Sequence, residues 1–168
     1  MDGAKSAVEF VSNKIAEGEF EKLKESKALT EDCFRDVVLN SSNFSMDQLR
    51  QIALSKEDII FNFMYQIGVI LDDDRNTRHV EITYTAHYKP EQNRDTFASD
   101  ESQDFETFQR SIVVLTYRFV RNYSKGVEDS WTINALNHVS MKDVLDGHDY
   151  WNENTYNFKL YNGHENFK

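Results

Sequence analysis

The side chains best suited to chemistry in this 168-residue chain are tyrosines that alternate with apolar residues along strand-like segments. The hydroxyls that could reach a cavity belong to Tyr65, Tyr84, Tyr88, Tyr117 and Tyr123. A hydroxyl can donate and accept a hydrogen bond, but general acid–base catalysis usually uses a carboxylate or a histidine. The strand positions that we predict to face inward contain neither. We therefore interpret these tyrosines as hydrogen-bonded residues of the core.

One segment imitates part of a calcium-binding loop. Asp72, Asp74 and Asn76 occupy the first, third and fifth positions of such a loop. The sixth position, which requires glycine for its sharp turn, is Thr77, and the twelfth, which requires a bidentate glutamate, is Thr83. The segment therefore predicts an acidic turn between two strands, without a metal site.

The remaining candidate ligands and nucleophiles lack the spacing of a site. The five histidines show no HxxxH pattern, and no CxxC, GxGxxG, GxxxxGK[ST] or GxSxG motif occurs. On the second predicted strand, His79, Glu81 and His87 fall on the side that faces solvent. We predict no catalytic residue, no metal site and no cofactor, and this pattern favours a binding protein over an enzyme.

Charge and cysteine content narrow the range of partners. Nineteen basic residues oppose 29 acidic ones, and the resulting net charge of −10 repels phosphate backbones, so we expect no nucleic-acid partner. Cys33 is the only cysteine, which excludes an internal disulfide and fits a reducing compartment; we expect it to be a buried residue of a helix. No apolar run of about 18 residues is present, so we expect no membrane-spanning helix.

The first third of the chain has helical periodicity. Apolar residues recur at steps of three and four over about residues 3–17, and Gly18 ends this helix. A second helix starts at Phe20. Thr30 is a predicted N-cap for a third helix that ends near residue 40, and Ser45 with Gln48 forms a capping box for a fourth.

From residue 58 the apolar period changes to two, which predicts strands. In the first strand we expect the odd-numbered residues from Ile59 to Leu71 to face inward, with a bulge or bend at Gly68. The inward residues of the second strand are predicted to be Val80, Ile82, Tyr84, Ala86 and Tyr88. Pro90 ends that strand.

Two further strands and four connecting or terminal segments complete the expected layout. We predict strands over residues 108–123 and 130–139, joined by a turn at 124–126, and a short helical turn over 140–145. The polar residues 89–104 favour an exposed loop. Residues 147–168 form a polar C-terminal tail with six aromatic residues, which could cross the domain, pair as an edge strand or bind a partner.

Together these elements predict one α+β domain over residues 1–146, followed by the tail. The N-terminal helices are expected to pack on one face of a long, curved antiparallel sheet of about four strands. A chain of this length has room for one core, and its 22 aromatic residues give that core a large buried area per side chain.

The region from Leu115 to Val139 also resembles a known family. Its Tyr117, Phe119, Arg121, Gly126 and the run Trp131, Thr132 and Ile133 resemble the closing hairpin of the mitochondrial matrix AAA protease-interacting proteins, which are related to the import-motor anchor of the inner-membrane translocase. A second match is an opening helix pair with Ala7, Phe10, Val11, Ser12, Phe20 and Leu23. The resemblance implies the cone-shaped nuclear transport factor 2-like fold.

The resemblance also implies roles for the matching residues. The motif residues are expected to be structural, and Trp131 is expected to cover the core against Tyr117 or Phe119 on the neighbouring strand. Tyr117 and Arg121 are included in this structural set, so the motif names no partner contact.

The function implied by the resemblance is that of a non-enzymatic adaptor in the mitochondrial matrix. Such a protein associates with the matrix AAA protease of the inner membrane and assists imported membrane-protein precursors, such as calcium uniporter regulatory subunits, in sorting, protection or assembly. Membrane association would be peripheral or indirect. A matrix address would require a transit segment, which we expect to have been removed ahead of Met1.

Two alternatives stay open. One is a membrane-side or ribosome-side tether like the import-motor anchor, against which the net charge of −10 argues. The other is an enzyme or small-molecule carrier that uses the cavity of a cone-shaped fold. A carboxylate and a histidine that share a cavity would support this second alternative, and a cavity filled by Phe and Leu would oppose it.

Overall fold

The structure is a computed structural model that describes residues 2–73, 76–90 and 105–146. Four helices come first, namely α1 (Asp2–Ala16), α2 (Phe20–Ser26), α3 (Glu31–Ser41) and α4 (Met46–Ile52). A 3-10 turn, η1 (Lys56–Asp58), leads into strands β1 (Ile59–Asp72), β2 (Thr77–Tyr88), β3 (Val113–Asn122) and β4 (Thr132–Ser140). Two short helices, α5 (Phe105–Arg110) and α6 (Met141–Leu145), precede β3 and follow β4.

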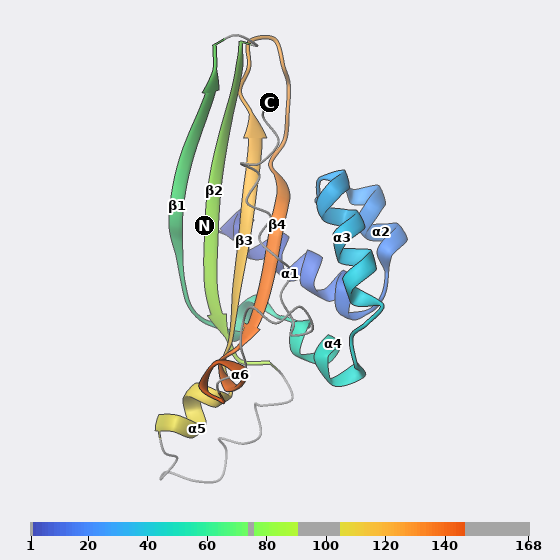
Figure 1. Cartoon of the computed structure of the whole chain (residues 1–168), viewed down its shortest axis with the longest axis vertical. Coiled ribbons are helices and arrows are strands. Elements are labelled where there is room, and N and C mark those ends of the chain that lie inside the picture. Colours follow the sequence, from blue (N-terminus) through green and yellow to red (C-terminus); the bar gives the residue numbers. More distant parts are fainter. Residues whose placement is uncertain (1, 74–75, 91–104, 147–168) are drawn as a thin grey trace.

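The predicted α+β class is confirmed. The strands form one antiparallel sheet in the order β1-β2-β3-β4, with the helices outside it. In Figure 1, α2 and α3 lie beside β4, and the end of the sheet with the β1–β2 connection projects past these helices. The sheet is not strongly curled, so the pronounced curvature expected from the sequence is absent.

The helices begin and end where local chemistry favours it. The Oγ1 of Thr30 accepts a hydrogen bond from the backbone N–H of Cys33 at the start of α3. Ser45 and Gln48 form the predicted reciprocal capping box at the start of α4. After α1, Gly18 has φ +69°, a left-handed conformation that glycine adopts without the steric cost of a Cβ.

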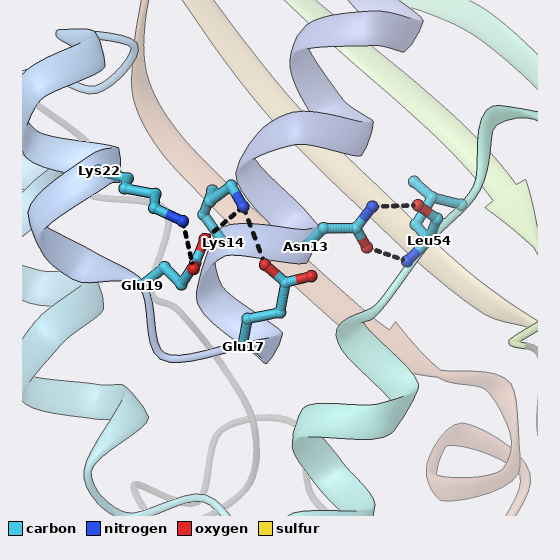
Figure 2. Close-up of polar contacts among 6 residues, drawn as sticks. All are labelled: Asn13, Lys14, Glu17, Glu19, Lys22 and Leu54. Carbon is cyan, nitrogen blue, oxygen red and sulfur yellow. Dashed lines mark hydrogen bonds and ion pairs between the residues drawn. The ribbon is translucent and has the colours of Figure 1, made fainter.

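Side chains of α1 tie this helix to its helical neighbours (Figure 2). The Asn13 amide donates to the carbonyl of Leu54 and accepts from its N–H, with both donor–acceptor distances 2.9 Å. This pairing satisfies both backbone groups of Leu54 between α4 and η1. Lys14 pairs with Glu17 and Glu19, and Glu19 also pairs with Lys22 of α2.

The main core lies between α1 and the sheet. Val8, Val11 and Ile15 are completely buried at steps of three and four residues along α1, as the periodicity predicts. They pack in one cluster with buried residues of β2, β3 and β4. The prediction for β2 is confirmed at Tyr84, Ala86 and Tyr88, which are fully buried at alternate positions; Cys33 is also buried, on α3.

The prediction for β1 is wrong, because the strand contains irregularities that shift its phase. The register moves from Met64 opposite Tyr84 to Gln66 opposite Thr83, so Tyr65 is an extra residue. Directly opposed residues share a face of the sheet, and the extra residue therefore puts Phe63 on one face and Ile67 on the other. Gly68 pairs regularly with Glu81, so the bulge is not at the glycine.

Some other predicted boundaries differ from those in the structure, and other predicted segments lie outside the described residues. Residues 105–110 form α5, so β3 starts at Val113 instead of residue 108. The predicted turn over 140–145 is confirmed as α6. Most of the predicted loop over 89–104 and the whole tail over 147–168 lie outside the described residues, and the division into a domain and a tail stays a prediction.

Candidate functional site

A buried chain of polar side chains connects the helices to the sheet. The Tyr117 hydroxyl lies 2.9 Å from Ser12 Oγ of α1 and 3.0 Å from His138 Nε2 of β4. On the other side of the ring, His138 Nδ1 lies 3.0 Å from the Tyr88 hydroxyl, which donates to the carbonyl of Gln51 at 2.6 Å. The chain therefore links α1, β3, β4, β2 and α4.

The Gln51 carbonyl at one end of these hydrogen-bonded side chains determines which atom is the donor in each hydrogen bond. A carbonyl only accepts, so Tyr88 uses its single hydroxyl hydrogen on Gln51 and must accept from Nδ1–H of His138. In a neutral imidazole, Nε2 is then the acceptor and receives the hydroxyl hydrogen of Tyr117. Ser12 in turn donates to Tyr117. Both ring nitrogens of His138 are occupied by hydrogen bonds within the core.

The presence of His138 corrects the expectation that no histidine faces inward. It stands opposite Leu115 in the β3–β4 register and is 6% exposed. Alternation along β4 with the buried Leu136 could have revealed its inward position, because residues two apart share a face. Sequence reasoning missed this signal by treating the strand only as part of a hairpin.

Burial explains the acid–base properties of the chain. Desolvation of the charged form lowers the pKa of His138 to about 3, so the ring is neutral at physiological pH. Burial also raises the pKa of the Tyr88 and Tyr117 hydroxyls, which remain protonated. No carboxylate hydrogen bonds to any of these groups among the described residues. The chain is therefore a set of neutral dipoles.

A small pocket borders the hydrogen-bonded side chains and has room for about one water molecule. Its walls are formed by Phe44, Gln48, Gln51, Ile52, Val113, His138 and Ser140. The lining contains a histidine but no carboxylate, and both nitrogens of that histidine are engaged in the core. This arrangement does not place an acid and an imidazole together in a cavity.

The five tyrosines that sequence analysis singled out have three different environments. Tyr88 and Tyr117 are hydrogen-bonded core residues, as predicted. Tyr84 is fully buried, but its hydroxyl makes no hydrogen bond to the described residues, and burial raises its pKa to about 12. Tyr65 and Tyr123 are exposed, so the prediction that they point inward is wrong.

Most of the motif residues have structural contacts. Tyr117, Phe119 and Ile133 are buried in the core. Ile133 also exchanges backbone hydrogen bonds with the α2–α3 connection, donating to Ala28 at 2.8 Å and accepting from Thr30 at 2.9 Å. Thr132 begins β4 beside it.

Gly126 and Arg121 of the motif lie at the turn end of the β3–β4 pair. Val127 N–H donates to Ser124 at 3.1 Å across a turn in which Gly126 has φ +79°, a conformation that favours glycine. The guanidinium of Arg121 lies 4.9 Å from the centre of the Tyr123 ring, a cation–π contact. Arg121 and Gly126 thus shape this end of the hairpin.

The predicted position of Trp131 is wrong. The residue is 37% exposed, and its ring packs edge-on against that of Tyr123 with centroids 6.3 Å apart. Among the described residues it makes no ring contact with Tyr117 or Phe119. Trp131 precedes the first residue of β4, and a bulge between Arg118 and Phe119 shifts the β3–β4 register nearby. A spacing argument that assumed regular pairing therefore assigned it to the core.

We expect Trp131→Leu to lower the free energy of unfolding by about 1 kcal/mol or less, because the loss is mainly that of one exposed aromatic pair. Urea denaturation of the two proteins would measure this difference. A loss above about 3 kcal/mol, which is the range for truncation of buried aromatic residues, would contradict the exposed position.

The largest exposed apolar feature of the described chain is β1. Its exposed apolar side chains range from 42% to 70% accessible and belong to Ile60, Phe61, Tyr65, Ile67, Val69, Ile70 and Leu71. The run from Ile59 to Leu71 contains no charged residue and no proline. Natural edge strands commonly carry charges or proline to prevent pairing with other chains. We call this run the β1 edge.

The two edges of the sheet differ in coverage. The β4 edge is partly covered, since the α2–α3 connection hydrogen-bonds to Ile133. Within the described residues, β1 pairs only with β2, so its other side has no strand partner. Exposed apolar surface on an unpaired edge is typical of an interaction site.

Residues 2–73, 76–90 and 105–146 contain neither a metal-ligand cluster nor a membrane-spanning helix. There, no three His, Cys, Asp or Glu side chains are grouped so that they could hold a metal ion. None of the helices in the same part combines the length and apolar character needed to cross a lipid bilayer.

With this geometry established, the chain can be compared with known proteins. No protein-family model, no curated protein and no solved structure matches it in these comparisons.

Proposed function

We propose that this protein is a non-enzymatic adaptor of the mitochondrial matrix. In this proposal it associates with the matrix AAA protease of the inner membrane and holds apolar segments of imported membrane-protein precursors during sorting, protection or assembly. The observation that carries the binding role is the β1 edge, an uncharged strand of the sheet with seven exposed large apolar side chains. The sequence resemblance supports the choice of compartment and partner.

The proposed mechanism is tethering. One surface would bind the protease complex while the β1 edge contacts a precursor, which raises the effective concentration of the precursor at the protease without bond chemistry. The neutral, internally hydrogen-bonded His138 supports a role that does not use acid–base catalysis. No metal or cofactor is required by this mechanism.

The proposal includes membership of the nuclear transport factor 2-like superfamily. The order of elements, with helices ahead of a four-stranded antiparallel sheet, supports this assignment. The matching hairpin residues Tyr117, Phe119 and Ile133 support it too, because they pack in the core, as family-defining structural residues would. The modest curl of the sheet is a departure from the cone shape.

Co-purification from mitochondria tests the partner. The full chain, carrying an affinity tag, is expressed in mitochondria and recovered under mild detergent, with an untagged chain as control. We expect the subunits of the matrix AAA protease to be enriched with the tagged chain. Their reproducible absence, with the tagged chain itself recovered, would refute the proposed association.

A further inference from the structure

We infer that the β1 edge binds an extended, uncharged apolar peptide segment with basic flanking residues, which adds to the sheet as a fifth strand beside β1. This inference rests on the proposed adaptor function and specifies its client-binding element and the chemical class of its client. The recognition would combine backbone hydrogen bonds from the strand edge with side-chain contacts on both faces.

The length and position of β1 suit strand addition. The strand has 14 residues, and its end projects with β2 beyond the helices (Figure 1). At a rise of about 3.3 Å per residue, an added segment of about ten residues would cover about 33 Å of this edge. Because every second residue of an edge strand points its N–H and C=O away from the neighbouring strand, such a segment gains affinity without sequence-specific contacts.

The bulge at Tyr65 gives both faces of the edge apolar character. Ile67 and Val69 stand opposite Ile82 and Val80, so these four side chains share the face that carries the core residue Tyr84. On the opposite face, Phe61 and Phe63 gather near His87, with ring centroids 5.5 to 6.5 Å apart. An added strand with apolar residues at successive positions would find apolar neighbours on both sides.

Charge determines which apolar segment fits. The β1 edge itself is uncharged. Its two ends carry charges of both signs, with Lys56, Glu57, Asp58 and Lys89 at one end and Asp72, Asp73 and Arg78 at the other. The whole chain carries a net charge of −10. Basic residues that flank an apolar segment would therefore be attracted by the net negative charge of the chain, and acidic flanks would be repelled.

The same charges disfavour a second copy of this chain as the occupant. Full antiparallel pairing of two β1 strands would place Ile59 opposite Asp72 of the other copy, and therefore Asp58 opposite Asp73. Like charges directly opposite each other destabilise a strand pair. Two chains of net charge −10 also repel each other at longer range.

A peptide-binding experiment tests the inference on the purified full chain. The probe is a fluorescein-labelled peptide of alternating valine and alanine with two lysines at each end, and its control carries glutamates in place of the lysines. We expect the lysine-flanked peptide to bind at least about tenfold more tightly at low salt, by fluorescence anisotropy, and this preference to weaken as salt is added. Equal binding of the two peptides, or no binding of either, would refute the inference.

A matched pair of variants locates the site. Val69→Lys puts a charge on the edge at a side chain that is 64% exposed, whereas Leu39→Lys puts the same charge on α3 at one that is 61% exposed. We expect Val69→Lys to weaken peptide binding by about tenfold or more and Leu39→Lys to change it less than about twofold. Equal effects of the two variants, with thermal unfolding of both near wild type, would place the peptide elsewhere.

Hydrogen exchange and sedimentation separate the possible occupants. We expect the peptide to slow amide exchange in β1 and the free chain to sediment as a monomer. A stable dimer whose formation Val69→Lys abolishes would show that a second copy occupies the edge. Protection of β1 in the peptide-free chain that disappears in a Phe158→Lys variant would show that the chain's own C-terminal segment occupies it. Either result would overturn the inference.

These readouts are independent of the protease. Peptide binding at β1 without recovery of protease subunits from mitochondria would preserve the site and refute the proposed partner. Recovery of the subunits with a chain that does not bind the peptide would preserve the partner and refute the site.

Discussion

Replacing Tyr117 by phenylalanine is expected to lower the free energy of unfolding by about 2–4 kcal/mol, although the ring itself is retained. Among the described residues, the hydroxyl is the only group that joins Ser12 of α1 to His138 of β4, and both of these residues are buried. Its removal leaves a buried donor and a buried acceptor without partners, each of which costs about 1–3 kcal/mol. Urea denaturation followed by circular dichroism would measure the change.

A matched control is available at Tyr123, which is exposed. Tyr123→Phe is expected to change the free energy of unfolding by less than about 0.5 kcal/mol, since surface substitutions of this kind have small effects. If Tyr117→Phe were as mild as Tyr123→Phe, the hydroxyl chain from Ser12 to Gln51 would not contribute to stability as described. The comparison isolates the hydroxyl, because both variants lose the same atom.

Lowering the pH is expected to destabilise the folded protein at pH values well above those at which carboxylates usually titrate. The pKa of His138 falls from an ordinary 6.5 to about 3 on folding, because the imidazolium would be desolvated in the core. Below pH 6.5 the unfolded chain takes up a proton at this ring, and the folded chain does not until about pH 3. The unfolded state therefore binds more protons in this window, and stability falls as pH decreases.

The expected slope is about 1.4 kcal/mol for each pH unit, or about 2 kcal/mol between pH 6.5 and pH 5. Burial also lowers the pKa of His87, which adds a contribution of the same sign. Glu19, whose pKa the ammonium groups of Lys14 and Lys22 lower from 4.5 to about 2, loses its contribution only at lower pH. Urea denaturation at a series of pH values would measure the slope.

The variant His138→Gln removes this titration and is expected to flatten the dependence between pH 6.5 and pH 5. Nuclear magnetic resonance of histidine-labelled full chain gives a second measurement that needs no variant. The His138 ring signals of the folded protein are expected to show no titration down to about pH 4. A midpoint near the ordinary value would show that the ring is accessible to water and would contradict its place in the hydrogen-bonded chain.

The buried histidine and the exposed strand separate the residues that stabilise the fold from those to which we assign binding in the proposed function. The polar chain through His138 holds the helices against β2, β3 and β4, whereas β1 has a neighbouring strand on one side only among the described residues. A surface that must accept a partner cannot have all its apolar groups buried in its own core. We therefore expect changes at Tyr117 to affect folding and changes at Val69 to affect binding.

The sequence by itself determined the elements whose signals are local. The periodicity of Val8, Val11 and Ile15, the Thr30 cap and the alternation of Tyr84, Ala86 and Tyr88 each depend on residues within one element, and all are confirmed. Local hydrogen bonds and the repeat of one helix or strand carry such signals. The α+β class followed from their order along the chain.

Only the tertiary structure decided which apolar residues are buried and which remain exposed. The pattern of β1 is that of an inward face, but the extra residue at Tyr65 changes the face, and no described element covers the outer side of the strand. Trp131 is exposed although it was expected in the core, and a bulge lies near it. His138 is buried although no inward histidine was predicted, and cross-strand hydrogen bonds hold it in the core. Alternation with Leu136 does indicate the face of His138, but the bulges at Tyr65 and near Trp131 depend on contacts between strands, which the spacing within one strand does not encode.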